Sequence, residues 1–115
     1  MTIKQTVLAA LEPVLPNTWA VELPKRPTWP AAVFDVDTEE EKGWVQGGGY
    51  DQHVVNLVVL ARTVEELDAL RPQLIAAMET IPGYMGNEGE GDGEYEDDPE
   101  VFGYFLNFRI RTRRT

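Results

Sequence analysis

The residues of this chain that could support chemistry are few, and most of them are acids. His53 is the only histidine, and Asp51 lies two positions before it. A histidine and a carboxylate can act together as a general base, but such catalysis also needs a nucleophile and a group that orients the base. Neither accompanies this pair, so we interpret His53 as a polar residue at the start of a strand. We expect no catalytic residues and no enzymatic activity.

Two further motifs could hold a phosphate or a metal ion. The run Gly47 to Gly49 lacks the Lys-Ser/Thr pair of a phosphate-binding loop and precedes a strand, so it indicates a turn or bulge. Oxygen ligands for Ca²⁺ or Mg²⁺ are offered by Asp92, Glu94, Glu96, Asp97 and Asp98. Their spacing differs from that of the helix-loop-helix calcium loop, and a solvated loop is the favoured interpretation. We predict no metal and no cofactor.

Three arginines near the C-terminus recur at every second position. In a strand, Arg109, Arg111 and Arg113 share one face. The opposite face collects apolar side chains, namely Phe102, Tyr104, Leu106, Phe108 and Ile110. The preceding glycine-rich segment, residues 86–100, holds eight acids and no basic residue. The chain thus places opposite charges where neighbouring copies can exchange them, although an edge strand protected by charge explains the arginines equally well.

Length and composition indicate one globular domain over residues 1–115. The chain is 43% apolar and 10% aromatic, which is typical of a folded domain despite the net charge of −10. An acidic protein is repelled by a phosphate backbone, so general nucleic-acid binding is disfavoured. There is no cysteine, no signal-peptide pattern and no apolar run of membrane-spanning length. We therefore expect a soluble protein that is made in the cytoplasm and has no membrane partner.

The hydrophobic periodicity predicts two helices and several strands. Thr2 caps a short first helix, and Thr63 with Glu66 forms a capping box for a second helix that ends near Thr80. A proline-rich connector, residues 13–30, leads into an alternating strand, and a second strand, residues 54–61, is apolar on both faces, which predicts cover on both sides. A short strand near Glu94–Glu96 is expected to pair with the last strand. The fold class is α+β, with an antiparallel sheet and two helices packed on one face.

These elements, taken in order, resemble the tail-terminator, or tail-completion, family of long-tailed bacteriophages and related gene-transfer particles. The resemblance rests on the helix that ends at Leu11 to Pro16, the strand entry from Pro27 to Phe34, the second strand and helix, and the closing strand Phe105 to Arg111. It implies an α+β fold and a structural virion protein. Such proteins form a ring, commonly a hexamer, that caps the tail tube, stops its growth and meets the head connector.

The resemblance also implies the partners and the location. The partners are further copies of the chain, the tail tube protein and the head-tail connector protein, with DNA passing through the central channel. The protein would reside in the tail or neck of the virion after assembly in the host cytoplasm. Two alternatives remain open. One is another connector or tube ring protein, and the other is an acidic inhibitor that mimics DNA charge.

Two hypotheses assign the charged residues to a ring. In the first, acids of one subunit face arginines of the next: Glu94, Glu96, Asp97 and Asp98 against Arg109, Arg111 and Arg113. In the second, the acidic segment lines the channel and repels DNA, while the arginines meet the tube or connector. Partly exposed ion pairs are screened by salt, so the first hypothesis predicts a salt-sensitive ring.

Overall fold

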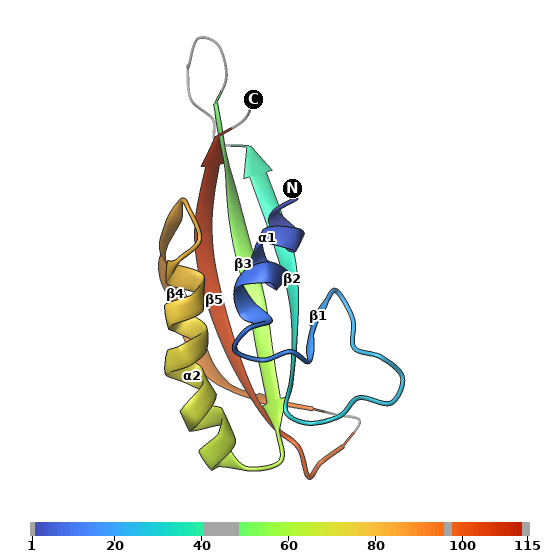
Figure 1. Ribbon diagram of the computed structural model, residues 1–115. Coiled ribbons are helices and arrows are strands. Elements are labelled where there is room, and N and C mark those ends of the chain that lie inside the picture. Colours follow the sequence, from blue (N-terminus) through green and yellow to red (C-terminus); the bar gives the residue numbers. More distant parts are fainter. Residues whose placement is uncertain (1, 41–48, 96–97, 114–115) are drawn as a thin grey trace.

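Five strands and two helices make up the described part of the chain, which covers residues 2–40, 49–95 and 98–113 of a computed structural model (Figure 1). The helices are α1 (Ile3–Leu11) and α2 (Val64–Glu79). The strands are β1 (Thr18–Ala20), β2 (Ala31–Glu40), β3 (Tyr50–Ala61), β4 (Tyr84–Glu94) and β5 (Phe102–Arg113). Together they form one α+β domain, which confirms the predicted fold class.

All five strands belong to one sheet, with the order β1-β2-β3-β5-β4. The pairs β2–β3, β3–β5 and β5–β4 are antiparallel, whereas β1 runs parallel to β2. The sheet is therefore mixed, and the prediction of a purely antiparallel sheet is wrong. The three residues of β1 lie in the proline-rich connector and are too few to show an alternating pattern, so periodicity does not reveal this strand.

The acidic segment is also more ordered than predicted. Most of β4, an eleven-residue edge strand paired with β5, falls in the predicted loop. Of the short strand predicted near Glu94–Glu96, Glu94 is the last residue of β4 and Tyr95 lies outside the strand. Glycines and acids are depleted in strands, which hid this strand from the sequence pattern. One glycine has a packing role, because a Cβ on Gly91 would lie 2.9 Å from the Phe105 ring. The bare backbone of β4 thus lets this ring approach it closely.

Both helices begin where the sequence predicts. The Thr2 hydroxyl accepts a hydrogen bond from the Gln5 N–H at 3.2 Å, and the Gln5 side chain accepts one from the Thr2 N–H at 2.9 Å. Thr63 caps α2 by accepting from the Glu66 N–H at 3.2 Å, but the Glu66 carboxylate accepts from the Thr63 hydroxyl at 3.3 Å and not from its N–H, so only the Thr63 half of the predicted capping box is present. Helix α2 continues through Pro72 to Glu79. Among the described residues, no helix is long and apolar enough to cross a membrane.

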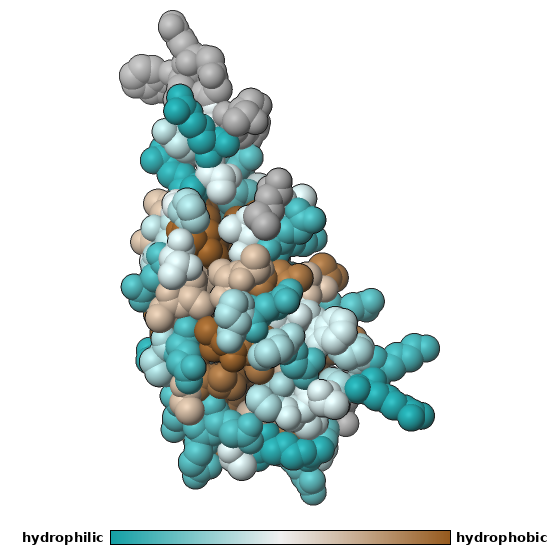
Figure 2. Space-filling view, in the orientation of Figure 1, coloured by the Kyte–Doolittle hydropathy of each residue, from teal (hydrophilic) through white to brown (hydrophobic). Residues whose placement is uncertain are grey.

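One hydrophobic cluster joins the helices to the sheet. Its helical members are Val7 and Leu11 of α1 with Leu67, Leu74 and Met78 of α2. These contact one face of the sheet, which carries Phe34, Val55, Leu57, Leu106, Phe108 and Ile110, all at most 1% exposed. In Figure 1 both helices lie in front of the sheet. Figure 2, in the same orientation, shows the apolar residues of this side as separate patches among hydrophilic ones.

Candidate subunit interface

The sheet face opposite the hydrophobic cluster, called the open face here, carries the predicted arginines. Cross-strand register sets its rows, since directly paired residues share a face. Asp37 of β2 pairs with Val54 of β3, which pairs with Arg109 of β5. The next row contains Glu39, Gln52 and Arg111 in the same order. The open face thus has an acidic column on β2 and a basic column on β5, with β3 between them.

Arg109 is held by partners within the chain. Its guanidinium forms an ion pair with Glu88 of β4, in which Nη2 donates to Glu88 Oε2 at 3.0 Å. Its Nη1 also donates to Gln52 Oε1 at 2.5 Å. The guanidinium lowers the pKa of the Glu88 carboxyl, and this carboxylate raises the pKa of Arg109. Both groups are therefore charged at neutral pH, and Arg109 is oriented across the face before any partner binds.

Arg111 and Arg113 extend the basic column toward the end of β5. The Arg111 guanidinium lies 3.8 Å from the centre of the Tyr50 ring, at cation–π distance. Arg113 is exposed at the last position of the strand. The structure therefore places all three predicted arginines on one face, in the order that the sequence pattern predicts.

The acidic column of β2 is organised by one amide. Asn56 Nδ2 of β3 donates to Asp35 Oδ1 at 2.7 Å and to Asp37 Oδ2 at 3.1 Å. Strand alternation places the two carboxylates on the same side of β2, and the amide bridges them. The alternation of these acids with apolar residues in β2 marks an exposed face in the sequence, but the sequence does not reveal their register with the arginines.

The predicted acidic residues lie elsewhere. Glu94 ends β4 opposite Phe102, seven positions before Arg109 along β5, which corresponds to about 23 Å at 3.3 Å per residue. Asp98 lies 3.6 Å from Arg62, which also lies 3.6 Å from Glu100. Glu96 and Asp97 lie outside the described residues. Glu94 and Asp98 thus do not meet the arginine column within one chain, and a contact between these groups would require a second copy.

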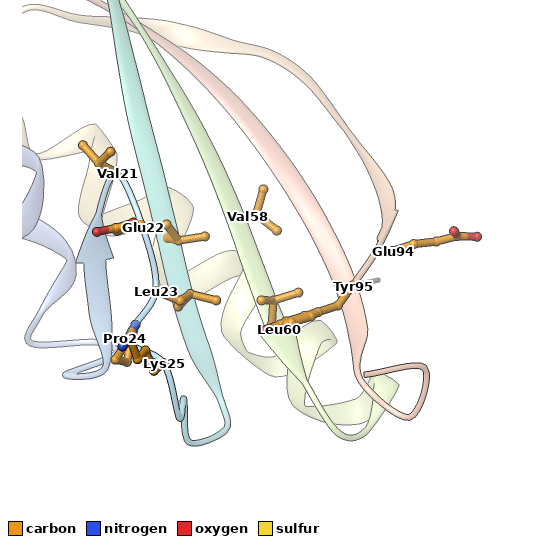
Figure 3. A pocket seen from close by; sticks show the side chains of 10 residues that line it. Val21, Glu22, Leu23, Pro24, Lys25, Val58, Leu60, Glu94 and Tyr95 are labelled. Atoms are coloured by element: carbon orange, nitrogen blue, oxygen red, sulfur yellow. The ribbon is translucent and has the colours of Figure 1, made fainter. Parts of the chain in front are cut away.

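A groove opens on the open face at the end where β2 begins. It has a volume of about 510 Å³ and a floor formed by Val33, Val58 and Leu60. Figure 3 shows Tyr95 extending back toward Leu60, while Glu94 points away from the groove. The Tyr95 ring makes an edge-to-face contact with Trp29, with ring centres 5.2 Å apart. Of the apolar residues of β3 on this face, Leu60 is thus buried by the chain itself, whereas Val54 and Val58 are only half-buried.

His53 has a structural environment. Strand β3 begins at Tyr50, so His53 lies inside the strand and only 6% of it is exposed, in contrast to the predicted place at the strand's start. Its Nδ1 lies 2.8 Å from the Thr38 hydroxyl and its Nε2 lies 2.7 Å from the Thr112 hydroxyl. It links β2, β3 and β5 on the helix-bearing face. Both ring nitrogens are thus hydrogen-bonded to side chains of neighbouring strands, which is typical of a structural histidine.

The burial of His53 predicts a lowered pKa and a pH-dependent stability. Burial lowers its pKa below the ordinary value of 6.5, with a smaller opposing effect of Asp51. As the pH falls, the unfolded chain takes up this proton before the folded chain, so the free energy of unfolding falls from about pH 7 downward. NMR titration of the single imidazole should give a pKa below 6.5, and His53→Gln should flatten this part of the stability profile. A pKa at or above 6.5 in the folded protein would contradict this.

The remaining predicted motifs lie only partly within the described residues. Within residues 2–40, 49–95 and 98–113, no group of three or more His, Asp or Glu side chains is arranged to hold a metal ion. Gly47 and Gly48 lie outside the described residues.

Comparisons with known proteins identify a shared fold. No protein-family model and no curated protein matches the chain. A solved structure described as "Virion of native gene transfer agent (GTA) particle" contains a similar chain, with a TM-score of 0.67 and 12% sequence identity. The superposition covers 97% of this chain and 95% of that one. The two chains therefore share the whole fold, including the sheet that carries the charged columns.

Proposed function

We propose that this chain is a non-catalytic structural protein of a phage-like virion. It closes into a ring on the end of the tail tube, terminates tube polymerisation and provides the surface that joins the head connector. The observation that carries this proposal is the fold likeness to a chain of a gene transfer agent virion, which extends over nearly all of both chains. The proposed ring, its hexameric state and its position on the tail tube rest on the resemblance of the sequence to the tail-terminator family.

The open face supports an assembly role. It presents fixed opposite charges and a partly covered apolar groove, which are features that bind another protein surface. We propose that Arg109, Arg111 and Arg113 belong to a subunit or partner interface. The acids Glu94, Glu96, Asp97 and Asp98 belong either to that contact or to the wall of the channel through which DNA passes.

The pairing of the acids of β4 favours this function over DNA mimicry. Glu88 is paired with Arg109, and Glu90 with Arg71 at 2.5 Å. The Tyr104 hydroxyl also donates to Glu90 Oε1 at 2.8 Å, and these bonds lower the pKa of the Glu90 carboxyl. A mimic of the phosphate backbone would need such acids unpaired, because they would have to attract the cations of a DNA-binding protein.

Tube growth tests the proposal. The purified chain, added to the polymerising tail tube protein of the same particle, should shorten the tubes and appear as a single disc at one tube end in electron micrographs. A terminator forms one closed ring at the tube end and stops there, whereas a tube subunit continues to add further copies to the growing tube. Tubes that keep their length, or incorporation of the chain along the tube wall, would contradict tail termination.

A further inference from the structure

Leu60 is buried on the open face by segments that lie outside the sheet. Its partners in the adjacent strands are Ala31 and Gly103, which are too small to cover a leucine. Leu60 is nevertheless only 3% exposed. It lines the groove of the open face together with Tyr95 and with residues 21–25, which begin the loop between β1 and β2. The cover of Leu60 therefore comes from this loop and from Tyr95, as Figure 3 shows.

The covering loop, residues 21–30, is itself loosely packed. None of these ten residues is buried. The groove of about 510 Å³ is bounded by the loop on one side and by the floor of Val33, Val58 and Leu60, so the loop and the floor are not in full contact. A segment with few buried apolar contacts opens locally at a low cost in free energy.

Hydrogen bonds hold the two ends of this loop. The Val21 N–H donates to a carbonyl of β2 at 2.7 Å, and the Asn17 side chain donates to the Thr28 carbonyl at 2.6 Å. The residues between these two bonds, 22–27, include two prolines, whose rings fix φ and stiffen the chain. The loop is thus a stiff segment between two fixed ends.

One of the fixed ends is strained. Val21 has a φ of 75°, in the left-handed region that β-branched residues rarely adopt. Its side chain is exposed, so burial does not hold it in this conformation. Backbone strain of this kind persists only where surrounding contacts impose it, and it is typical of clamps and switch regions. A movement of the loop that lets Val21 leave this region would relieve the strain.

We infer that residues 22–27 form a lid that pivots about its two fixed ends and uncovers the floor of the groove. In the structure the lid is closed and Leu60 is buried. Opening exposes Leu60 beside the half-buried valines of the floor and joins these apolar residues to the charged columns of the open face. The lid thus sets how much apolar surface the open face presents.

Thiol labelling tests the lid, because the chain has no cysteine of its own. Leu60→Cys should react with DTNB at least about tenfold faster than Leu57→Cys, because opening the lid needs less free energy than unfolding the sheet. Leu57 is the matched control, since it is fully buried in the same strand on the helix-bearing face. Low concentrations of urea should speed the labelling of Leu57→Cys much more than that of Leu60→Cys. Equal labelling rates for the two variants would overturn the inference.

Substitutions in the loop distinguish a moving lid from a fixed gap. In the Leu60→Cys chain, Val21→Asn should lower the labelling rate several-fold, because asparagine tolerates the left-handed backbone of the closed form. Leu23→Ala, which removes a half-buried side chain from the lid, should raise the rate several-fold. Val21→Ile keeps the strain and should leave the rate unchanged. A labelling rate that is the same with Val21 and with Val21→Asn would overturn the inference. These measurements need neither tubes nor rings, so their outcome does not depend on the proposed function.

Discussion

Replacing Phe108 by alanine is expected to lower the free energy of unfolding by about 3–5 kcal/mol, the range for truncating a large buried aromatic side chain. Phe108 lies in β5 and is fully buried among the residues of both helices and the sheet. Its ring centre lies 6.1 Å from that of Tyr84. The cavity left by the substitution is enclosed on both sides, so the chain has little room to collapse into it. Urea denaturation of the two proteins measures the loss.

Phe105→Ala is the matched control for this substitution. Phe105 lies three residues earlier in the same strand but on the open face, where it remains 36% exposed. Its truncation should cost only about 1 kcal/mol, because less apolar surface returns to water. Equal losses from the two substitutions would contradict the assignment of the core to the helix-bearing face.

Replacing Gly83 by alanine is expected to destabilise the fold by about 2–4 kcal/mol, since left-handed backbone strain and overpacking each contribute. Gly83 has a φ of 89°, and a Cβ at this position would fall on the Arg111 carbonyl oxygen. The Gly83 carbonyl also accepts a hydrogen bond from the Arg111 N–H at 2.9 Å. The turn between α2 and β4 is thus held against β5 by backbone contacts, which cannot move aside as a side chain can.

Gly89→Ala provides the comparison within β4. The nearest atom to a Cβ at Gly89 is the side-chain nitrogen of Asn107, at 3.7 Å, an ordinary van der Waals distance. Thermal denaturation should therefore show a large drop in midpoint for Gly83→Ala and a small change for Gly89→Ala. Similar midpoints for the two variants would show that the turn does not require glycine.

The sequence predicted those elements that have strong local signals. The capped helices and the alternating strand before Glu40 follow periodicity and capping chemistry, which depend on neighbouring residues only. The sharing of one face by Arg109, Arg111 and Arg113 follows from the strand repeat, and their placement confirms it.

What the sequence could not predict depends on contacts between distant segments. Strand β4 forms because β5 pairs with it, although its own glycines and acids disfavour a strand. The partners of the charges are equally non-local, since Arg109 pairs with Glu88 and Arg62 with Asp98. His53 carries no sequence signal for burial, because its two threonine partners come from β2 and β5.

The mass and shape of the assembled protein test the proposed ring most directly. Native mass measurement combined with electron microscopy, on the purified chain and on the chain mixed with tail tubes, should show a closed ring with a central hole. Six copies of the 13.0 kDa chain correspond to about 78 kDa. A chain that stays monomeric both alone and in the presence of assembled tubes would contradict the ring.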